Sequence, residues 1–237
     1  MANTVICLPT YNERENLEPM VHALVPLGVR VLVIDDNSPD GTGEIADRLA
    51  DELDVVSVLH RERKEGLGPA YLAGFERALA DGAEYVLELD CDFSHDPADV
   101  PRLLAACDAG ADLALGSRYV PGGGTENWGL LRRIVSWGGS FYARALLGVG
   151  VRDLTGGMKC YRRRVLETID LDAVESKGYA FQIETTYRAL RKGFRVVEVP
   201  IRFVDRTEGH SKMSHGIVLE AIVKVPALRL AALRGRL

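Results

Sequence analysis

Short apolar segments alternate with helical patterns through the first half of the chain. The apolar segments are rich in β-branched and aliphatic residues, which favour strands, and they cover residues 4–8, 31–34, 55–59, 85–89 and 112–116. Between two of them, Ile45, Leu49 and Leu53 recur every four residues, which indicates one face of a helix with Thr42 as its expected N-cap. Apolar strands that alternate with helices predict an α/β fold with a Rossmann-like, mainly parallel sheet and helices on both faces.

The pattern changes after Tyr119. The sequence then predicts a loop, an amphipathic helix with three arginines, a strand or hairpin, a second helix and a last strand, at residues 121–124, 130–148, 153–161, 180–192 and 195–204. The tail from Ile217 has a helical period, with Pro226 as a kink or a stop. We therefore expect one domain over residues 1–213 and an amphipathic basic tail over residues 214–237.

The composition narrows the class of protein. The 237 residues carry a net charge of −5, which argues against nucleic-acid binding because that function needs a basic surface. Four cysteines without metal-ligand spacing indicate a reducing compartment; they are Cys7, Cys91, Cys107 and Cys160. We find no secretory signal and no uninterrupted apolar run of about 18 residues. The expectation is a cytoplasmic protein that is soluble or bound to a membrane surface.

Unusual polar residues gather where the predicted strands end. They form the segments PTYNE (9–13), DDNSPDGT (35–42), DCDFSH (90–95) and GSRY (116–119). In open α/β sheets, ligands bind at the carboxyl ends of the strands. Three acidic strand ends in one sheet are hard to explain structurally, and nucleotide-sugar binding explains them together.

Two carboxylates follow the fourth apolar segment directly. Asp90 and Asp92 lie on the same side of an extended segment, because side chains there alternate with period two. Two convergent carboxylates suit a hard divalent cation, which prefers oxygen ligands. The alternative is a solvated loop in which Asp96 caps the helix that Pro97 begins. Both interpretations stay open on these residues alone.

The first two strand ends offer groups that could recognise a nucleoside. Tyr11 supplies a flat face for a base, while Glu13 and Asp36 supply acceptors for its N–H donors. The structural alternative is a simple turn in each place, with Asp36 bonded to the turn backbone.

The chain resembles a known family from residue 9 to residue 213, nearly its whole length. The motifs that carry the resemblance, in the family's order, are PTYNE, IDDNSPDGT, GLGPAYLAGF, DCDFSH, GSRY, DLTGGMKCYRR, GYAFQIE and VPIRFVDRTEGHSK. They resemble the dolichyl- or polyprenyl-phosphate mannosyltransferases, inverting glycosyltransferases of family 2 with the GT-A fold. Each motif alone is weakly specific, but the set is highly specific. The resemblance implies a GT-A catalytic domain over residues 1–213.

The resemblance also implies roles for individual residues. Guanosine would be held by Pro9, Tyr11, Glu13, Ile34 and Asp36. The ribose and diphosphate would be held by Asp90, Cys91 and Asp92, and a Mg²⁺ or Mn²⁺ ion by Asp90 and Asp92. Phosphates of the donor and acceptor would be bound by Arg118, Arg206 and Lys212, which with Asp92 are the predicted catalytic residues.

Two positions leave alternatives open. Arg132 is a candidate, with Arg118, for the acceptor phosphate, and a solvated helix face is its equal alternative. Ser94 stands where some family members have glutamine, which puts a third side-chain metal ligand in doubt.

The implied reaction moves mannose from GDP-mannose to a polyprenyl monophosphate. A phosphate monoester has a second pKa of about 6, so the nucleophile is mostly deprotonated and no general base is needed. We accordingly expect turn and loop roles for the histidines His95, His210 and His215. Gln182 and Glu184 are expected on a helix, in a polar supporting role. One alternative is a glucosyltransferase that uses UDP-glucose, and another is a non-catalytic protein that binds a nucleotide sugar.

The tail suggests where the acceptor is met. From Ala221 onward it has no acidic residue and four basic ones among apolar residues; they are Lys224, Arg229, Arg234 and Arg236. This mixture suits an anionic membrane surface, so we expect peripheral attachment to the cytoplasmic face of a membrane. The alternative is a helix that packs on the domain, and a membrane partner subunit stays open.

Overall fold

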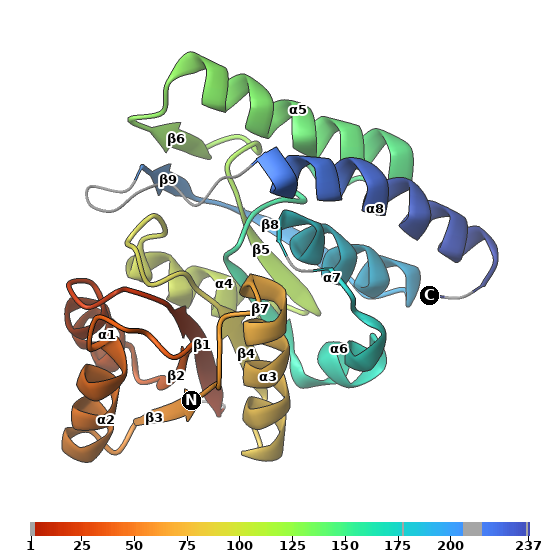
Figure 1. The fold of residues 1–237 in the computed structure, drawn as a ribbon. Coiled ribbons are helices and arrows are strands. Elements are labelled where there is room, and N and C mark those ends of the chain that lie inside the picture. The colour runs from red at the N-terminus through yellow and green to blue at the C-terminus, as the bar shows by residue number, and fades with distance from the viewer. Residues whose placement is uncertain (1–2, 177, 206–214, 236) are drawn as a thin grey trace.

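A seven-stranded sheet forms the centre of the molecule, in the order β3-β2-β1-β4-β7-β5-β8 (Figure 1). The computed structural model describes residues 3–176, 178–205, 215–235 and 237. The strands of this sheet are β1 (Thr4–Thr10), β2 (Arg30–Asp35), β3 (Val56–His60), β4 (Tyr85–Glu88), β5 (Leu113–Ser117), β7 (Lys159–Arg162) and β8 (Val196–Pro200). Neighbouring strands are parallel except at β7, which runs antiparallel between β4 and β5. The predicted mainly parallel sheet is confirmed.

Helices cover both faces of this sheet. One face carries α1 (Leu17–Leu24), α2 (Thr42–Glu52) and α4 (Val100–Asp108), and the other carries α3 (Leu67–Ala80), α6 (Arg163–Thr168) and α7 (Tyr179–Arg191). Along β1, Ile6 and Leu8 belong to the first core cluster, whereas Val5 and Cys7 belong to the second. Both faces of the strand are therefore buried, which explains why its sequence is apolar throughout.

Helix α3 lies very close to the sheet. A Cβ atom at Gly74 would lie 2.4 Å from Ile34 Cδ1 and 3.1 Å from Cys7 Sγ, so only glycine fits there. This close approach fixes the helix that carries Tyr71, one turn earlier, whose hydroxyl reaches the end of β4.

A second, two-stranded parallel sheet lies beside the first. It pairs β6 (Gly124–Glu126) with β9 (Arg202–Val204), so the strand predicted over residues 195–204 is divided at Ile201. Phe203 of β9 also forms an isolated antiparallel bridge with His95. The loop after β4 is thereby joined to the segment that leads into the next helix.

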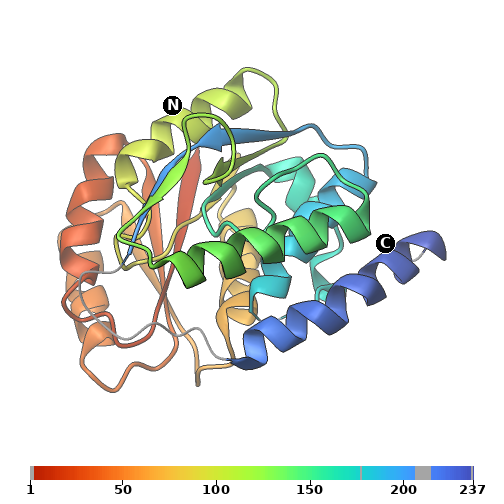
Figure 2. The same ribbon diagram turned by 90° about the horizontal axis from the view of Figure 1, so that it is seen from above.

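Helices α5 (Leu130–Leu147) and α8 (His215–Leu233) lie side by side (Figures 1 and 2). The Tyr142 hydroxyl donates to the Ile222 carbonyl oxygen at 3.1 Å. Val225 and Leu228 of α8 are buried in a third core cluster that also contains residues of α5 and α7. The helix continues past Pro226, so a stop at that residue is wrong.

The turn before α2 differs from its expected chemistry. Its N-cap is Gly41, with φ at 91°, and Thr42 is the first helical residue. The Thr42 N–H and hydroxyl both donate to Asp40 Oδ1, at 3.1 and 2.6 Å. The same hydroxyl accepts from the Glu13 N–H at 3.0 Å. Thr42 therefore ties the loop after β1 to the loop after β2 instead of capping the helix.

Candidate active site

Three strand-end loops contain a non-glycine residue in the left-handed region. Asn12 follows β1, Asn37 follows β2 and Phe93 follows β4, with φ angles of 57°, 57° and 56°. This conformation is unfavourable for residues with a side chain, most of all for a bulky one such as Phe93, and such strain concentrates at functional sites. The three loops are those singled out in the sequence, and they lie at the carboxyl edge of the sheet.

The residues predicted to hold guanosine come together after β1 and β2. Pro9 and Ile34 are partners in the parallel register of these strands, and Ile34 is fully buried. Glu13 follows in the β1 loop, and its carboxylate accepts a hydrogen bond from the Asn16 amide at 2.9 Å.

Two cations of the chain cover the other guanosine candidates. The Lys64 ammonium lies 3.9 Å from the centre of the Tyr11 ring, and the Arg61 guanidinium forms an ion pair with Asp36. Burial raises the pKa of Asp36 above its ordinary value, and the positive charge of Arg61 offsets this only in part. The structural alternative gave Asp36 a bond to the backbone of its own turn. In the structure Asp35 makes such a bond, because it accepts from the Ser38 N–H at 3.1 Å.

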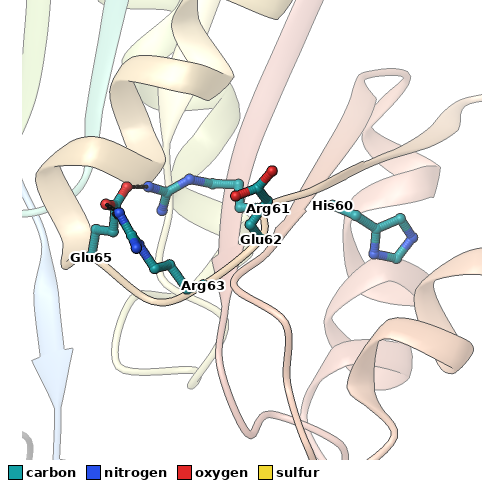
Figure 3. Close-up of a pocket in the computed structure, with 5 residues that line it drawn as sticks. All are labelled: His60, Arg61, Glu62, Arg63 and Glu65. Atoms are coloured by element: carbon teal, nitrogen blue, oxygen red, sulfur yellow. Dashed lines mark hydrogen bonds and ion pairs between the residues drawn. The ribbon is translucent and has the colours of Figure 1, made fainter.

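An open hollow of about 310 Å³ lies beside these cations, at the end of β3. Figure 3 shows its lining, with Arg61 and Arg63 directed at Glu65 and with His60 pointing away from them. His60 instead makes a hydrogen bond of 2.7 Å with Asp47 of α2. The segment that covers Tyr11 and Asp36 is thus held by a small network of ion pairs of its own.

The acid pair lies in the loop after β4, with Cys91 buried between the two carboxylates. Asp90 Oδ1 accepts from the Tyr71 hydroxyl at 3.2 Å, and Asp92 Oδ1 accepts from the Ser94 N–H at 3.0 Å. Asp96 Oδ1 accepts from the Ala98 N–H at 2.9 Å, as a cap of the 3₁₀ turn Pro97–Asp99. The capping interpretation is therefore confirmed for Asp96, while Asp90 and Asp92 are fixed in orientation and keep oxygen-rich chemistry suited to a hard cation.

A buried polar network lies directly behind the acid pair. Glu88 and Lys159 face each other in register across β4 and β7, and both are fully buried. Glu88 accepts from the Tyr161 hydroxyl at 2.8 Å, and the Lys159 ammonium donates to the Gln182 carbonyl oxygen at 2.8 Å and to the Thr185 hydroxyl at 3.2 Å. Burial raises the pKa of Glu88 and lowers the pKa of Lys159 to about 8. The charged residues inside the apolar runs VLEL and MKCY were the signal in the sequence, and sequence reasoning missed it.

The two polar residues predicted on α7 have different surroundings. Glu184 is tied into the protein by an ion pair with Arg188 and by the Ser176 hydroxyl. The side-chain amide of Gln182 is buried, and neither of its atoms has a hydrogen-bond partner among the described residues. It lies close enough to Glu88 to act as a hydrogen-bond donor that lowers the pKa of that carboxyl against the effect of burial, and Glu88 Oε2 likewise has no partner that meets strict hydrogen-bond geometry among the described residues.

The two arginines predicted for the acceptor phosphate flank one aromatic ring. The centres of the Arg118 and Arg132 guanidinium groups lie 5.6 and 4.3 Å from the centre of the Trp128 ring. Arg118 is buried and forms a forked pair with Asp153, at 2.7 Å for each of two bonds. Burial alone would raise the pKa of Asp153, but Arg118 holds it below the ordinary value. Arg132 pairs with Asp205, so both guanidinium groups are anchored by carboxylates.

His95 lies near both Asp92 of the acid pair and Arg118. Its ring packs edge-on against Phe203, with 4.9 Å between centroids, and Asp92, Arg118 and Asp153 are the charges that act on it. Burial lowers the pKa of His95 to about 4. The other two predicted phosphate ligands, Arg206 and Lys212, lie outside the described residues, as does His210.

Comparisons with known proteins decide the family. A profile described as "Glycosyl transferase family 2" matches residues 5–170. The polyprenol monophosphomannose synthase of Mycolicibacterium smegmatis is 54% identical, over 99% of this chain and 88% of that protein. The undecaprenyl-phosphate mannosyltransferase of Micrococcus luteus is 52% identical, over 97% of each chain. The chain belongs to glycosyltransferase family 2.

Solved structures of other glycosyltransferases show the same fold. A glucosyl-3-phosphoglycerate synthase of Mycobacterium tuberculosis, in complex with UDP, has a TM-score of 0.70 at 18% identity and covers 96% of this chain and 80% of its own. A mannosyltransferase of Pyrobaculum calidifontis, in complex with GDP-Man and Mn²⁺, has a TM-score of 0.55 at 17% identity and covers 98% and 74%. The GT-A fold, the membership among glycosyltransferases and the resemblance to polyprenyl-phosphate mannosyltransferases are confirmed.

This family 2 enzyme turns an unusual face outward along α5. The helix buries only small or end residues, Ser140, Ala143 and Leu147, while its large apolar side chains are exposed. The exposed set consists of Leu130, Leu131, Ile134, Val135, Trp137, Phe141, Tyr142 and Leu146, and α8 adds Ile222, Val223, Leu230 and Leu233. We call these residues the apolar face. Exposed patches of this kind mark sites of interaction with proteins or membranes.

Proposed function

We propose that the protein transfers mannose, with inversion, from GDP-mannose to a polyprenyl monophosphate of the dolichyl type. The observation that carries this proposal is that His95, in the loop of Asp90 and Asp92, packs against Phe203 at 4.9 Å between ring centroids, and that the Arg118 guanidinium lies 5.6 Å from the same Phe203 ring, so that the acid pair and the arginine belong to one site. The acid pair suits a metal-bound diphosphate, and the arginine suits a lipid phosphate. The names of two relatives at 54% and 52% identity support the choice of mannose and of a polyprenyl acceptor.

The acceptor itself explains why the site needs no general base. A phosphate monoester with a second pKa of about 6 is mostly a dianion near neutral pH and can attack directly. The protein then contributes positioning and charge stabilisation. Arg118 suits this role because Asp153 fixes its planar fork in place before substrate arrives. In this proposal Asp92, Arg118, Arg206 and Lys212 remain the catalytic residues.

A divalent cation, Mg²⁺ or Mn²⁺, fits Asp90 and Asp92. Both carboxylates come from one short loop, and each is oriented by a hydrogen bond to one of its oxygens, from the Tyr71 hydroxyl and the Ser94 N–H. Hard cations favour such oxygen donors and bind diphosphate oxygens alongside them. When bound, the ion would neutralise charge on the departing GDP.

Guanosine would occupy the end of the site built by Pro9, Tyr11, Glu13, Ile34 and Asp36, with Cys91 near the ribose. Because Lys64 covers the Tyr11 ring and Arg61 pairs with Asp36, binding there would exchange contacts that the chain already makes. The polar hollow that Arg61 lines gives this cation room to move.

The apolar face supports attachment to the cytoplasmic surface of a membrane. None of the described helices is long and apolar enough to cross a bilayer. The face combines large apolar side chains with the exposed Arg133 and Arg144 on the same helix, which suits an interface with anionic lipids. In this arrangement residues 1–213 hold the chemistry, residues 214–237 help to form the membrane contact, and a membrane partner subunit stays open.

The test compares donors and acceptors directly. Purified protein is incubated with GDP-mannose or UDP-glucose, with a long-chain polyprenyl phosphate, and with Mg²⁺, Mn²⁺ or a chelator. We expect mannosyl lipid from GDP-mannose only, with loss of product in the chelator, and a higher melting temperature with GDP-mannose than with UDP-glucose. Transfer from UDP-glucose alone would favour the glucosyltransferase alternative, and binding without any transfer would favour a non-catalytic protein.

A further inference from the structure

Two buried side chains next to the acid pair have unused hydrogen-bonding atoms. His95 and Gln182 are each 1% exposed, and among the described residues both ring nitrogens of His95 and both amide atoms of Gln182 lack a partner. Folded proteins satisfy nearly all buried polar groups, because an unsatisfied one costs stability. Glu88 Oε2 is a further unpartnered atom, close enough to Gln182 for the amide to act on that carboxyl. One donor of the amide can therefore serve Glu88, and the ring nitrogens of His95 and the amide oxygen of Gln182 indicate a ligand that supplies the remaining partners.

The unused atoms border one small space. A Cβ atom at Gly157 would lie 3.4 Å from Asp90 Oδ2, 3.7 Å from His95 Nε2 and 3.9 Å from Gln182 Nε2. Two segments far apart in the sequence, the loop after β4 and helix α7, thus converge on the bare backbone of Gly157, which is partly exposed. Gly157 and Asp90, the carboxylate that is proposed to hold the metal, are partly exposed, and the unused atoms of His95 and Gln182 lie beneath them.

The surroundings hold both side chains in place. The backbone of Gln182 is fixed by the Lys159 ammonium and by the Thr186 hydroxyl, which both donate to its carbonyl oxygen, at 2.8 and 2.9 Å. His95 is fixed by its backbone bridge to Phe203 and by the contact between their rings. The backbone of Gln182 and the ring of His95 are therefore held in defined positions beside Gly157.

The chemistry of the group distinguishes between possible ligands. A side-chain amide presents a donor and an acceptor together, and an imidazole can do the same, whereas a phosphate offers mainly acceptors. A sugar hydroxyl both donates and accepts, so it matches this set, while the guanidinium groups suited to a phosphate lie around Trp128. We infer that His95, Gln182 and the bare Cα of Gly157 form the subsite that holds the ring hydroxyls of the transferred hexose. This inference rests on the proposed function, because it places the hexose beside the metal-bound diphosphate.

Two substitutions test the subsite. Gly157→Ala puts a methyl group into the space at ordinary contact distances of 3.4 Å or more and at a backbone conformation open to alanine, so the fold should survive. Gln182→Met keeps the length of the side chain and removes its donor and acceptor. The matched controls are Gly150→Ala, where a Cβ meets nothing within 4 Å, and Tyr187→Phe, which removes another buried unpartnered hydroxyl of α7.

Calorimetry and steady-state kinetics are run on all four variants, with melting curves to check folding. We expect unchanged affinity for GDP, and a loss of about 10- to 100-fold in kcat/KM for GDP-mannose in Gly157→Ala and Gln182→Met only. Wild-type kinetics in both test variants would overturn the subsite. A higher KM for the acceptor, with donor kinetics unchanged, would assign the space to the acceptor phosphate and would also overturn it.

A second measurement does not depend on the fold of a variant. GDP-mannose analogues that each lack one ring hydroxyl are compared on the wild-type protein and on Gln182→Met. We expect at least one analogue to lose about tenfold or more on the wild type and much less on Gln182→Met, since the same hydrogen bond is missing twice. Equal losses on both proteins for every analogue would overturn the inference. If the wild type transfers glucose instead, the proposed function fails separately, and the same variants are measured with UDP-glucose.

Discussion

The two ends of the site differ in whether the chain itself already contacts the groups that would bind substrate. At the nucleoside end the chain covers its own recognition groups, with Lys64 over Tyr11 and Arg61 paired with Asp36. At the other end, where the sugar and the acceptor are proposed to bind, His95 has unused nitrogens among the described residues, and α5 has large apolar side chains exposed. Binding at the first end exchanges contacts, whereas binding at the second end adds contacts that the chain lacks.

This difference indicates which parts of the substrates should determine the substrate selectivity of the enzyme. An exchanged contact gives little net free energy, because the new interaction must replace one that the protein already has. A ligand that satisfies a buried polar group removes a penalty of about 1–3 kcal/mol for that group. We therefore expect the sugar and the lipid, more than the base, to decide which substrates are used.

The largest effect is expected at the junction of the two ends. Asp92→Asn keeps an oxygen that can accept from the Ser94 N–H but removes the charge. Loss of a comparable electrostatic stabiliser costs about 10²-fold or more in turnover, so we expect at least that loss in mannosyl transfer, measured with radiolabelled GDP-mannose. The rise in melting temperature on adding Mn²⁺ with GDP should also disappear.

Asp96→Asn is the matched control for that substitution, because Asp96 caps the next turn and asparagine caps equally well. It should transfer mannose at the wild-type rate. Near-normal transfer by Asp92→Asn in the presence of metal would remove the metal assignment, and the acid pair would then be a structural turn.

The apolar face should give the next largest effect. Leu131 and Trp137 are 76% and 55% exposed, and burying a side chain of this kind in lipid is worth about 1.5–3 kcal/mol. Leu131→Ser combined with Trp137→Ser should therefore weaken binding to anionic vesicles by about tenfold or more, measured by co-sedimentation. Transfer to a short, water-soluble acceptor should be unchanged.

Val55→Ser is the control for this pair, because Val55 is an exposed apolar residue next to β3 and outside the apolar face. Unchanged vesicle binding in the double variant, together with a smaller mass in solution than the wild type, would reassign the face to contacts between protein chains.

The pH dependence of stability tests whether water reaches the buried His95 ring. Burial lowers the pKa of His95 from 6.5 to about 4, so between these values the unfolded chain binds the extra proton and the folded chain does not. The free energy of unfolding should therefore fall as the pH falls through this window, by at most about 1.4 kcal/mol per unit from this residue. In urea unfolding, His95→Asn should lose less stability than the wild type between pH 6.5 and pH 4. Parallel curves would mean that water reaches the ring.

The smallest effect is expected at the nucleoside end. Lys64→Ala uncovers the Tyr11 ring, and a cation over an aromatic ring at an exposed site is worth about 0.5–1 kcal/mol. GDP should therefore bind about two- to fivefold more tightly, measured by calorimetry. Arg63→Ala is the control, because Arg63 is a cation of the same segment that pairs with Glu65. Weaker binding to Lys64→Ala would show that Lys64 holds the ligand and does not cover the pocket.

The local features of this protein could be predicted from its amino-acid sequence. Strand and helix follow from the period of apolar residues, which is a property of neighbouring positions, so the mainly parallel sheet and the helix at residues 130–148 could be predicted. The motifs after β1, β2 and β4 could be placed at one edge because parallel strands share a direction. Where prediction failed locally, at Thr42, the hydroxyl donates to the neighbouring Asp40 and accepts from the N–H of the distant Glu13, and these bonds replace the expected cap.

Contacts between residues that are far apart in the sequence could not be predicted and depend on the packing of the whole chain. Arg61 lies 25 residues from Asp36, and Gln182 lies far from His95, so no pattern of neighbouring residues predicts that the first pair is satisfied and the second is not. The same holds for α5: its apolar face could be read from the sequence, but whether that face meets the core or solvent depends on α7 and α8, which already fill the core with Tyr187, Val225 and Leu228. Packing leaves room under α5 for little more than Ser140 and Ala143, and the large side chains of the helix therefore point outward.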